Sequence, residues 1–94
     1  MTHAGAFALL ESTHDFPCSY TIKAIGSALD DFEGRILGAA RGAHARPVDV
    51  SHSARTTPNG VHMAVTLDVR VESPDEVVAL YRALQVVQGL RFLI

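Results

Sequence analysis

The residues best suited to metal or nucleophilic chemistry in this sequence are five histidines and one cysteine. His3 and His14 lie in the N-terminal region, His44 in a predicted loop, and His52 and His62 on the two predicted strands of a hairpin. Counting from the turn between these strands places His52 and His62 on different faces of a sheet. A structural metal site needs several closely spaced ligands, and the sequence has no His-x-x-His or Cys-x-x-Cys pair. We therefore expect no metal site and no metal cofactor.

One thiol and a run of carboxylates are the other candidates for catalysis. Cys18 follows Pro17, and no basic cluster or helix N-terminus is predicted beside it to activate a thiolate, so we interpret it as a small buried residue. Glu72, Asp75 and Glu76 surround the start of a predicted helix, where acidic side chains serve as caps. Because no nucleophile–base pair or paired acid and base can be argued, the sequence predicts a protein that is not an enzyme and uses no cofactor.

Composition restricts the class of protein. Ninety-four residues with 48% hydrophobic and 19% charged side chains are typical of one globular domain. The net charge of -2 gives no reason to expect nucleic acid or an anionic membrane as a partner. The apolar run Ala4–Leu10 is too short for a signal peptide or a membrane span. We expect a soluble cytoplasmic protein with a flexible arm over residues 1–15 and one domain over residues 16–94.

The strongest structural pattern is the alternation over Val61–Val71, in which every odd residue is apolar. A period of two over eleven residues predicts a strand with one face on a core and one face open. The turn residues Thr57–Gly60 connect it to an antiparallel partner strand predicted over Val48–Thr56. Further strands are predicted over Ser19–Ile25, ended by Gly26, and over Leu90–Ile94.

The first helix is predicted to begin after Ser27, which is a good N-cap, and to run to Arg41. Leu29 opens its apolar stripe. Gly34 and Gly38 weaken the helix, and we interpret them as points of close approach to the sheet.

The second helix has Ser73 as its cap, Pro74 at its first position and Glu76 as the reciprocal partner of a capping box. Gly89 is predicted to close it. The order βαββαβ predicts a ferredoxin-like α+β sandwich, a four-stranded antiparallel sheet with two helices on one face. Its sheet order would be fourth, first, third, second strand. The predicted core comprises Ile22, Phe32, Ile36, Val65, Leu67, Val69, Leu80, Leu84 and Phe92.

Four segments of the chain carry a resemblance to a known family. They read DFPC at 15–18, IKAIG at 22–26, VRVES at 69–73 and LYRAL at 80–84. In this order and at nearly this spacing, they resemble the YbeD-like family of small bacterial proteins over most of residues 9–94. The resemblance implies a ferredoxin-like fold similar to the regulatory modules called ACT domains, with no established activity and no catalytic residues. The chain departs from the family at residues 57–62, where TPNGVH replaces a Ser-x-x-Gly-x-Tyr pattern.

Two other functions found on this fold are disfavoured by the residues. Acylphosphatases hold an anion at the first strand-to-helix loop, but here that loop has no arginine, and Asp30 and Asp31 would repel a phosphate. RNA-recognition domains stack bases on aromatic residues of the open sheet face. The open face predicted here has no aromatic residue and consists of Lys23, Ile25, Ser51, Ser53, Thr66, Asp68, Arg70 and Arg91.

The first functional hypothesis is a small interaction protein that docks a partner or self-associates through its open sheet. Ile25 and Leu93 are predicted to emerge on that face with Ala64, and the outer strands present unpaired edges. A homodimer is the leading form because symmetric pairing is the commonest way to close such surfaces. A monomer with scattered exposed apolar residues is the other possibility. Lys23 and Asp68 form either a cross-strand charge pair or part of a ligand or partner contact.

The second hypothesis is an ACT-like regulatory module that binds a small metabolite near the first strand-to-helix loop. Gly26 would let a ligand approach the backbone, and free amides at the helix start near Ser27 would bind a carboxylate. The sequence identifies neither the ligand nor the pathway.

Overall fold

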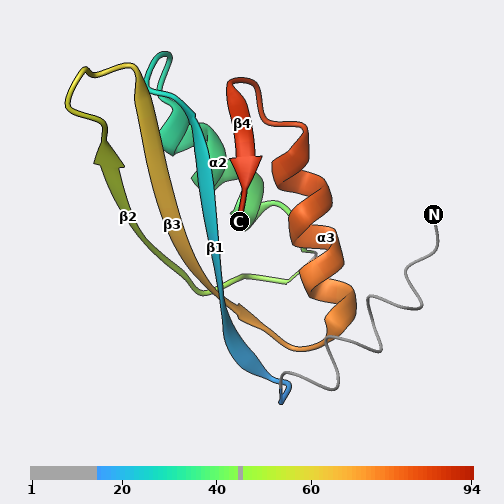
Figure 1. Ribbon diagram of the computed structural model, residues 1–94. Coiled ribbons are helices and arrows are strands. Elements are labelled where there is room, and N and C mark those ends of the chain that lie inside the picture. The colour runs from blue at the N-terminus through green and yellow to red at the C-terminus, as the bar shows by residue number, and fades with distance from the viewer. Residues whose placement is uncertain (1–14, 45) are drawn as a thin grey trace.

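The computed structural model describes residues 15–44 and 46–94. Within them, both helices cover one face of a four-stranded antiparallel sheet, as Figure 1 shows. This is the predicted ferredoxin-like arrangement. The elements are β1 (Cys18–Ser27), α2 (Phe32–Arg41), β2 (Val50–Thr56), β3 (His62–Val71), α3 (Pro74–Gln85) and β4 (Leu90–Leu93).

The strand order is β2-β3-β1-β4, which confirms the predicted order. β3 lies between β2 and β1 and pairs antiparallel with both. Its register with β1 runs from Cys18 opposite Val71 to Ser27 opposite His62. β2 and β4 are therefore the outer strands of the sheet, and β4 is short.

The core lies between the sheet and the two helices. Eight of the nine predicted core residues are fully buried, whereas Phe92 is 63% exposed. The apolar stripe of α2 contributes Phe32, Ile36 and Ala40, and that of α3 contributes Val77, Leu80 and Leu84. The hydrophobic effect on these stripes and on the inner face of the sheet drives the sandwich together.

The first helix begins later than the sequence predicts. β1 continues through Gly26 to Ser27, and the N-cap is Asp31, whose Oδ1 accepts a hydrogen bond from the Gly34 amide at 3.2 Å. Asp30 and Asp31 have positive φ angles of 57° and 54°, a conformation that aspartate tolerates better than most residues. Ser27 is not the cap because backbone pairing keeps it in the strand. Leu29, expected in the buried stripe, lies in the connection and is 67% exposed.

Other element ends also differ from the prediction. β2 begins at Val50 and β3 at His62, and Val61 just before β3 is 51% exposed. α3 ends at Gln85, and Gly89 lies in the turn to β4 with a φ of +93°. Neither helix in the described ranges is long and apolar enough to cross a membrane.

Candidate binding surface

The face of the sheet that turns away from both helices carries no covering element in the part of the chain that the structure describes (Figure 1). Because strand side chains alternate between the two faces, paired residues on neighbouring strands form rows across this open face. Two of these rows run from β1 through β3 to β2 near the β2–β3 hairpin. They read Lys23, Thr66 and Ser53, and then Ile25, Ala64 and Arg55.

The outer strand β4 and the residue after it add large apolar side chains to this face. Phe92 pairs with Ile25 and is 63% exposed. Ile94 exchanges two backbone hydrogen bonds with Lys23, at 3.0 and 2.9 Å, and is 70% exposed. Ile25, Phe92 and Ile94 thus form one apolar patch on the open face.

A bulge in the β1–β4 pairing reverses the predicted orientation of this strand. Gly26 pairs with Leu90 but Ile25 pairs with Phe92, so one extra residue, Arg91, stands between them on β4. A one-residue slip moves every later side chain to the opposite face. Leu93 therefore shares the helix side with its partner Ala24 and packs against the core. The predictions that Leu93 emerges on the open face and that Phe92 is buried are both wrong.

The same bulge corrects the prediction that the open face has no aromatic residue, because Phe92 lies on it. RNA-recognition domains stack two or three bases on the aromatic residues of their sheets, and the single ring of Phe92 offers less stacking surface than that. The expectation of no nucleic-acid partner stays a prediction.

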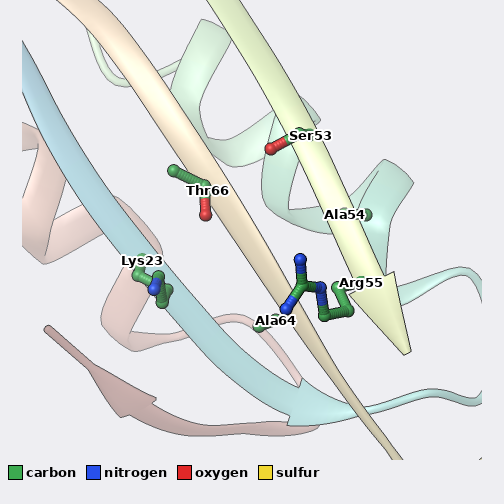
Figure 2. Close-up of a pocket in the computed structure, with 6 residues that line it drawn as sticks. All are labelled: Lys23, Ser53, Ala54, Arg55, Ala64 and Thr66. Atoms are coloured by element: carbon green, nitrogen blue, oxygen red, sulfur yellow. The ribbon is translucent and has the colours of Figure 1, made fainter. Parts of the chain in front are cut away.

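A hollow of about 310 Å³ lies beside the apolar patch on the open face. Figure 2 shows Lys23 on β1 and Arg55 on β2, with the Arg55 side chain reaching over β3 above Ala64. The small side chains of Ala64 and Thr66 form its floor between the two long cationic ones. We call this feature the cationic hollow; its lining residues are Lys23, Ser53, Ala54, Arg55, Ala64 and Thr66.

Lys23 and Asp68 do not form the cross-strand ion pair that the sequence left open. The register places Lys23 opposite Thr66 and Asp68 opposite Thr21, so the two charges are diagonal neighbours. Thr21 Oγ1 donates a hydrogen bond to Asp68 Oδ1 at 2.5 Å. The Lys23 side chain is therefore not paired with Asp68, and it lines the cationic hollow.

The loop at Gly26 and Ser27 does not have the geometry that the metabolite hypothesis required. A side-chain carbon at Gly26 would lie 2.4 Å from the Gly89 carbonyl oxygen and 2.5 Å from Phe32 Cζ. The space beside Gly26 is thus filled by the core and by the turn before β4. Ser27 donates its amide to the Gly89 carbonyl, and the nearby start of α2 is capped by Asp31.

The close approach that the sequence assigned to Gly34 and Gly38 occurs at Gly26 instead. A side-chain carbon at Gly34 would meet the Asp31 cap rather than the sheet, and one at Gly38 would have no neighbour within 4 Å. The glycine at position 34 leaves room for the Asp31 side chain that caps the helix, whereas the space around Gly38 is open.

The shortest ion pair among the described residues joins Arg46 to Glu76. Glu76 Oε2 accepts from Arg46 Nε at 2.9 Å, and Glu76 Oε1 accepts from Arg46 Nη2 at 2.5 Å. Glu76 Oε1 also accepts the Glu72 amide at 2.8 Å, and Arg46 Nη2 donates to the Arg70 carbonyl at 3.0 Å. These bonds tie the α2–β2 connection to the end of β3 and the start of α3. Glu76 is thus a structural residue, and its carboxylate does not bond the Ser73 amide as a capping box would.

The hydrogen bonds around Glu76 predict that the stability of the protein depends on pH. The hydrogen bond from Arg46 lowers the pKa of Glu76 to about 2 against the opposing effect of burial, and the Glu72 amide lowers it further. Because the folded-state pKa lies below the unfolded one, the stabilisation is full above about pH 4.5 and is lost as the pH falls towards 2. Glu76→Gln should lower the free energy of unfolding at pH 7 by about 1–2 kcal/mol. Urea unfolding of both proteins between pH 7 and pH 2 should show their stabilities converging at acid pH.

The neighbouring Asp75→Asn substitution is the matched control. Asp75 is an exposed acid in the same helical turn, and we expect a change within about 0.5 kcal/mol. Stability curves of wild type and Glu76→Gln that stay parallel from pH 7 to pH 2 would contradict the role given to Glu76.

Other reactive side chains are placed in structural surroundings. Cys18 is a free, half-buried cysteine packed against the core. Tyr20 and Tyr81 meet edge to face with ring centres 6.3 Å apart, and burial, followed by the Tyr20 hydroxyl at 3.5 Å, raises the pKa of Tyr81. His52 lies on the outer strand β2 with its Nε2 2.9 Å from Glu33 Oε2 on α2.

No cluster of three or more His, Cys, Asp or Glu side chains suitable for a metal occurs in residues 15–44 and 46–94. His52 on β2 lies opposite Leu67 on β3. His3 and His14, like nearly all of the predicted arm, lie outside the described residues. The expectation of no metal cofactor stays a prediction.

Comparison with known proteins identifies the family. The model of a family described as "Protein of unknown function (DUF493)" matches residues 11–94. The chain belongs to this family. A UPF0250 protein of Shewanella amazonensis is 31% identical over 87 residues, which cover 88% of this chain and 97% of the relative. A UPF0250 protein of Idiomarina loihiensis is 32% identical over 80 residues, covering 85% and 89%. The resemblance to the YbeD-like family is confirmed, and the DUF493 description assigns no activity.

Two solved structures are similar to this DUF493 protein. The ACT domain from a GTP pyrophosphokinase of Chlorobium tepidum superposes with a TM-score of 0.64 at 15% identity, covering 82% of this chain and 97% of that domain. The solution structure of protein HP0495 from H. pylori gives a TM-score of 0.63 at 14% identity, covering 87% and 86%. At this identity the likeness shows the fold alone. It confirms the ACT-like, ferredoxin-like architecture.

Proposed function

We propose that this protein is a non-enzymatic interaction module that self-associates through the open face of its sheet, with a homodimer as the leading form. The observation that carries the proposal is the apolar patch. The β4 bulge turns Phe92 outward beside Ile25, and Ile94 follows it on the same face. Phe92 on β4 is 63% exposed and Ile94 directly after it is 70% exposed, so a second surface that covers both would lower the free energy.

The position of the patch supports pairing between identical chains. Phe92 lies on β4 and Ile94 directly follows it, and the outer edge of β4 has no partner strand within the described residues. An unpaired edge offers backbone donors and acceptors to another strand. A two-fold contact here would bury the apolar patch of both chains at once, and closed two-fold dimers are the commonest soluble oligomers.

Phe92→Glu should weaken self-association strongly. A carboxylate in the middle of the apolar patch would have to be buried without a partner, or the contact would have to open. Sedimentation velocity over a wide range of protein concentrations should show a concentration-dependent dimer for the wild type and a monomer for the variant. Ile25→Glu on β1 should act in the same direction.

Val86→Glu is the matched control, because Val86 is 83% exposed but lies at the end of α3 in the helix layer. It should leave the dimer intact. A wild-type monomer at hundreds of micromolar, or equal effects of Phe92→Glu and Val86→Glu, would contradict self-association through the apolar patch.

An ACT-like regulatory role is the second candidate function. The filled space at Gly26 argues against a ligand at the first strand-to-helix loop. The cationic hollow favours a different place for a small molecule, on the open face between Lys23 and Arg55.

A further inference from the structure

Two cations line the cationic hollow without an acidic partner. Among the described residues, the ion pairs within 4 Å join Arg46 to Glu76 and His52 to Glu33, so Lys23 and Arg55 are in neither. Arg35, by contrast, donates to the Gln88 carbonyl at 3.0 Å. A lysine and an arginine that converge from two strands on one hollow leave positive charge there unneutralised.

The surroundings of these two cations suit an anionic group. Thr66 and Ser53 place two hydroxyl groups in the row of Lys23, and both line the hollow. Ala64 lies below the guanidinium of Arg55, so no large side chain fills the space above β3 (Figure 2). Guanidinium groups bind carboxylates and phosphates through two parallel hydrogen bonds, while lysine and hydroxyl groups add single donors.

We infer that the cationic hollow is a binding site for a small molecule that carries phosphate or carboxylate groups. Its volume of about 310 Å³ lies at the lower end of the range of ligand sites, which fits a compact metabolite. Asp68 lies on the same face of β3, two residues beyond Thr66, and its carboxylate already accepts from Thr21. Its negative charge directs the anion towards the Arg55 and Ala64 end of the hollow. This inference does not depend on self-association.

The test is an NMR titration of the full ¹⁵N-labelled chain with inorganic pyrophosphate and, separately, with succinate. Sodium chloride keeps the ionic strength constant, so that general screening is the same at every point. The expected result is a saturable shift of the backbone amides of residues 23, 53–55, 64 and 66. Saturation by pyrophosphate alone would show that the hollow prefers phosphate groups, and saturation by succinate alone would show that it prefers carboxylate groups. The inference is overturned if neither probe saturates.

Variants decide whether the hollow itself binds the probe. Arg55→Gln and Lys23→Gln should each weaken binding about tenfold or more, because each removes a charged donor. Arg41→Gln, at an exposed arginine on α2, should leave the affinity unchanged. Equal affinities for wild type and Arg55→Gln would overturn the inference, as would shifts spread over all basic residues.

A titration of Phe92→Glu separates this inference from the proposed function. Binding that persists in this variant while sedimentation shows no dimer in the wild type would support the hollow and reject self-association. A wild-type dimer that binds neither probe would support self-association and reject the hollow as a site for anions.

Discussion

Leu67→Ala is expected to lower the free energy of unfolding by about 2–5 kcal/mol, because the truncation removes buried methyl groups and leaves a cavity. Leu67 lies in the central strand β3, between Ile22 on β1 and His52 on β2, and is fully buried. The core that contains Leu67 also includes buried side chains from β1, α2 and α3, so a cavity at Leu67 has little freedom to collapse. Urea unfolding followed by circular dichroism measures the change.

Val86→Ala is the control for this measurement. Val86 is 83% exposed, and its truncation should change stability by less than about 0.5 kcal/mol. A loss below about 0.5 kcal/mol for Leu67→Ala as well would show that the layer between sheet and helices is not packed as described.

Gly26→Ala is expected to cost about 3 kcal/mol or to prevent folding, although alanine is a small residue. The added methyl group would lie 2.4 Å from the Gly89 carbonyl oxygen and 2.5 Å from the ring of buried Phe32. The Gly89 carbonyl also accepts the Ser27 amide at 3.0 Å, so it cannot move without loss of that bond. Overpacking of this kind costs about 1–3 kcal/mol and sometimes more, because backbone rather than a flexible side chain must yield.

Gly38→Ala provides the opposite control within the same protein. A methyl group at Gly38 meets nothing within 4 Å, and alanine favours the helix by up to about 1 kcal/mol. Thermal unfolding should therefore give a lower Tm for Gly26→Ala and an equal or higher Tm for Gly38→Ala. Equal stability of Gly26→Ala and wild type would contradict the tight contact among β1, Phe32 and the turn before β4.

The arrangement of helices and strands follows from local patterns in the sequence. The alternation over residues 61–71 and the apolar stripes of the two helices each bury one side of one element. Burial of those sides leaves few arrangements for a βαββαβ chain, because crossover connections have a fixed hand. The strand order and eight of nine core residues therefore come from the sequence itself.

The candidate binding surface depends on contacts between segments that are distant in the sequence. The bulge at Arg91 depends on how β4 meets Gly26, so no alternation within Leu90–Ile94 reveals that Phe92 faces outward and Leu93 inward. The N-cap of α2 is likewise Asp31 and not the predicted Ser27, because β1 stays paired with β3 through Ser27.

Charge partners show the same division between sequence and structure. Glu76 lies in the first turn of α3, as its sequence position predicts, but its main partner is Arg46, thirty residues away. Lys23 and Arg55 are each ordinary exposed residues in the sequence, and only the strand register places them around one hollow. Periodicity in a sequence determines which side of an element is buried. The register between strands determines which residues meet on the exposed side, because a shift of one residue exchanges the two faces.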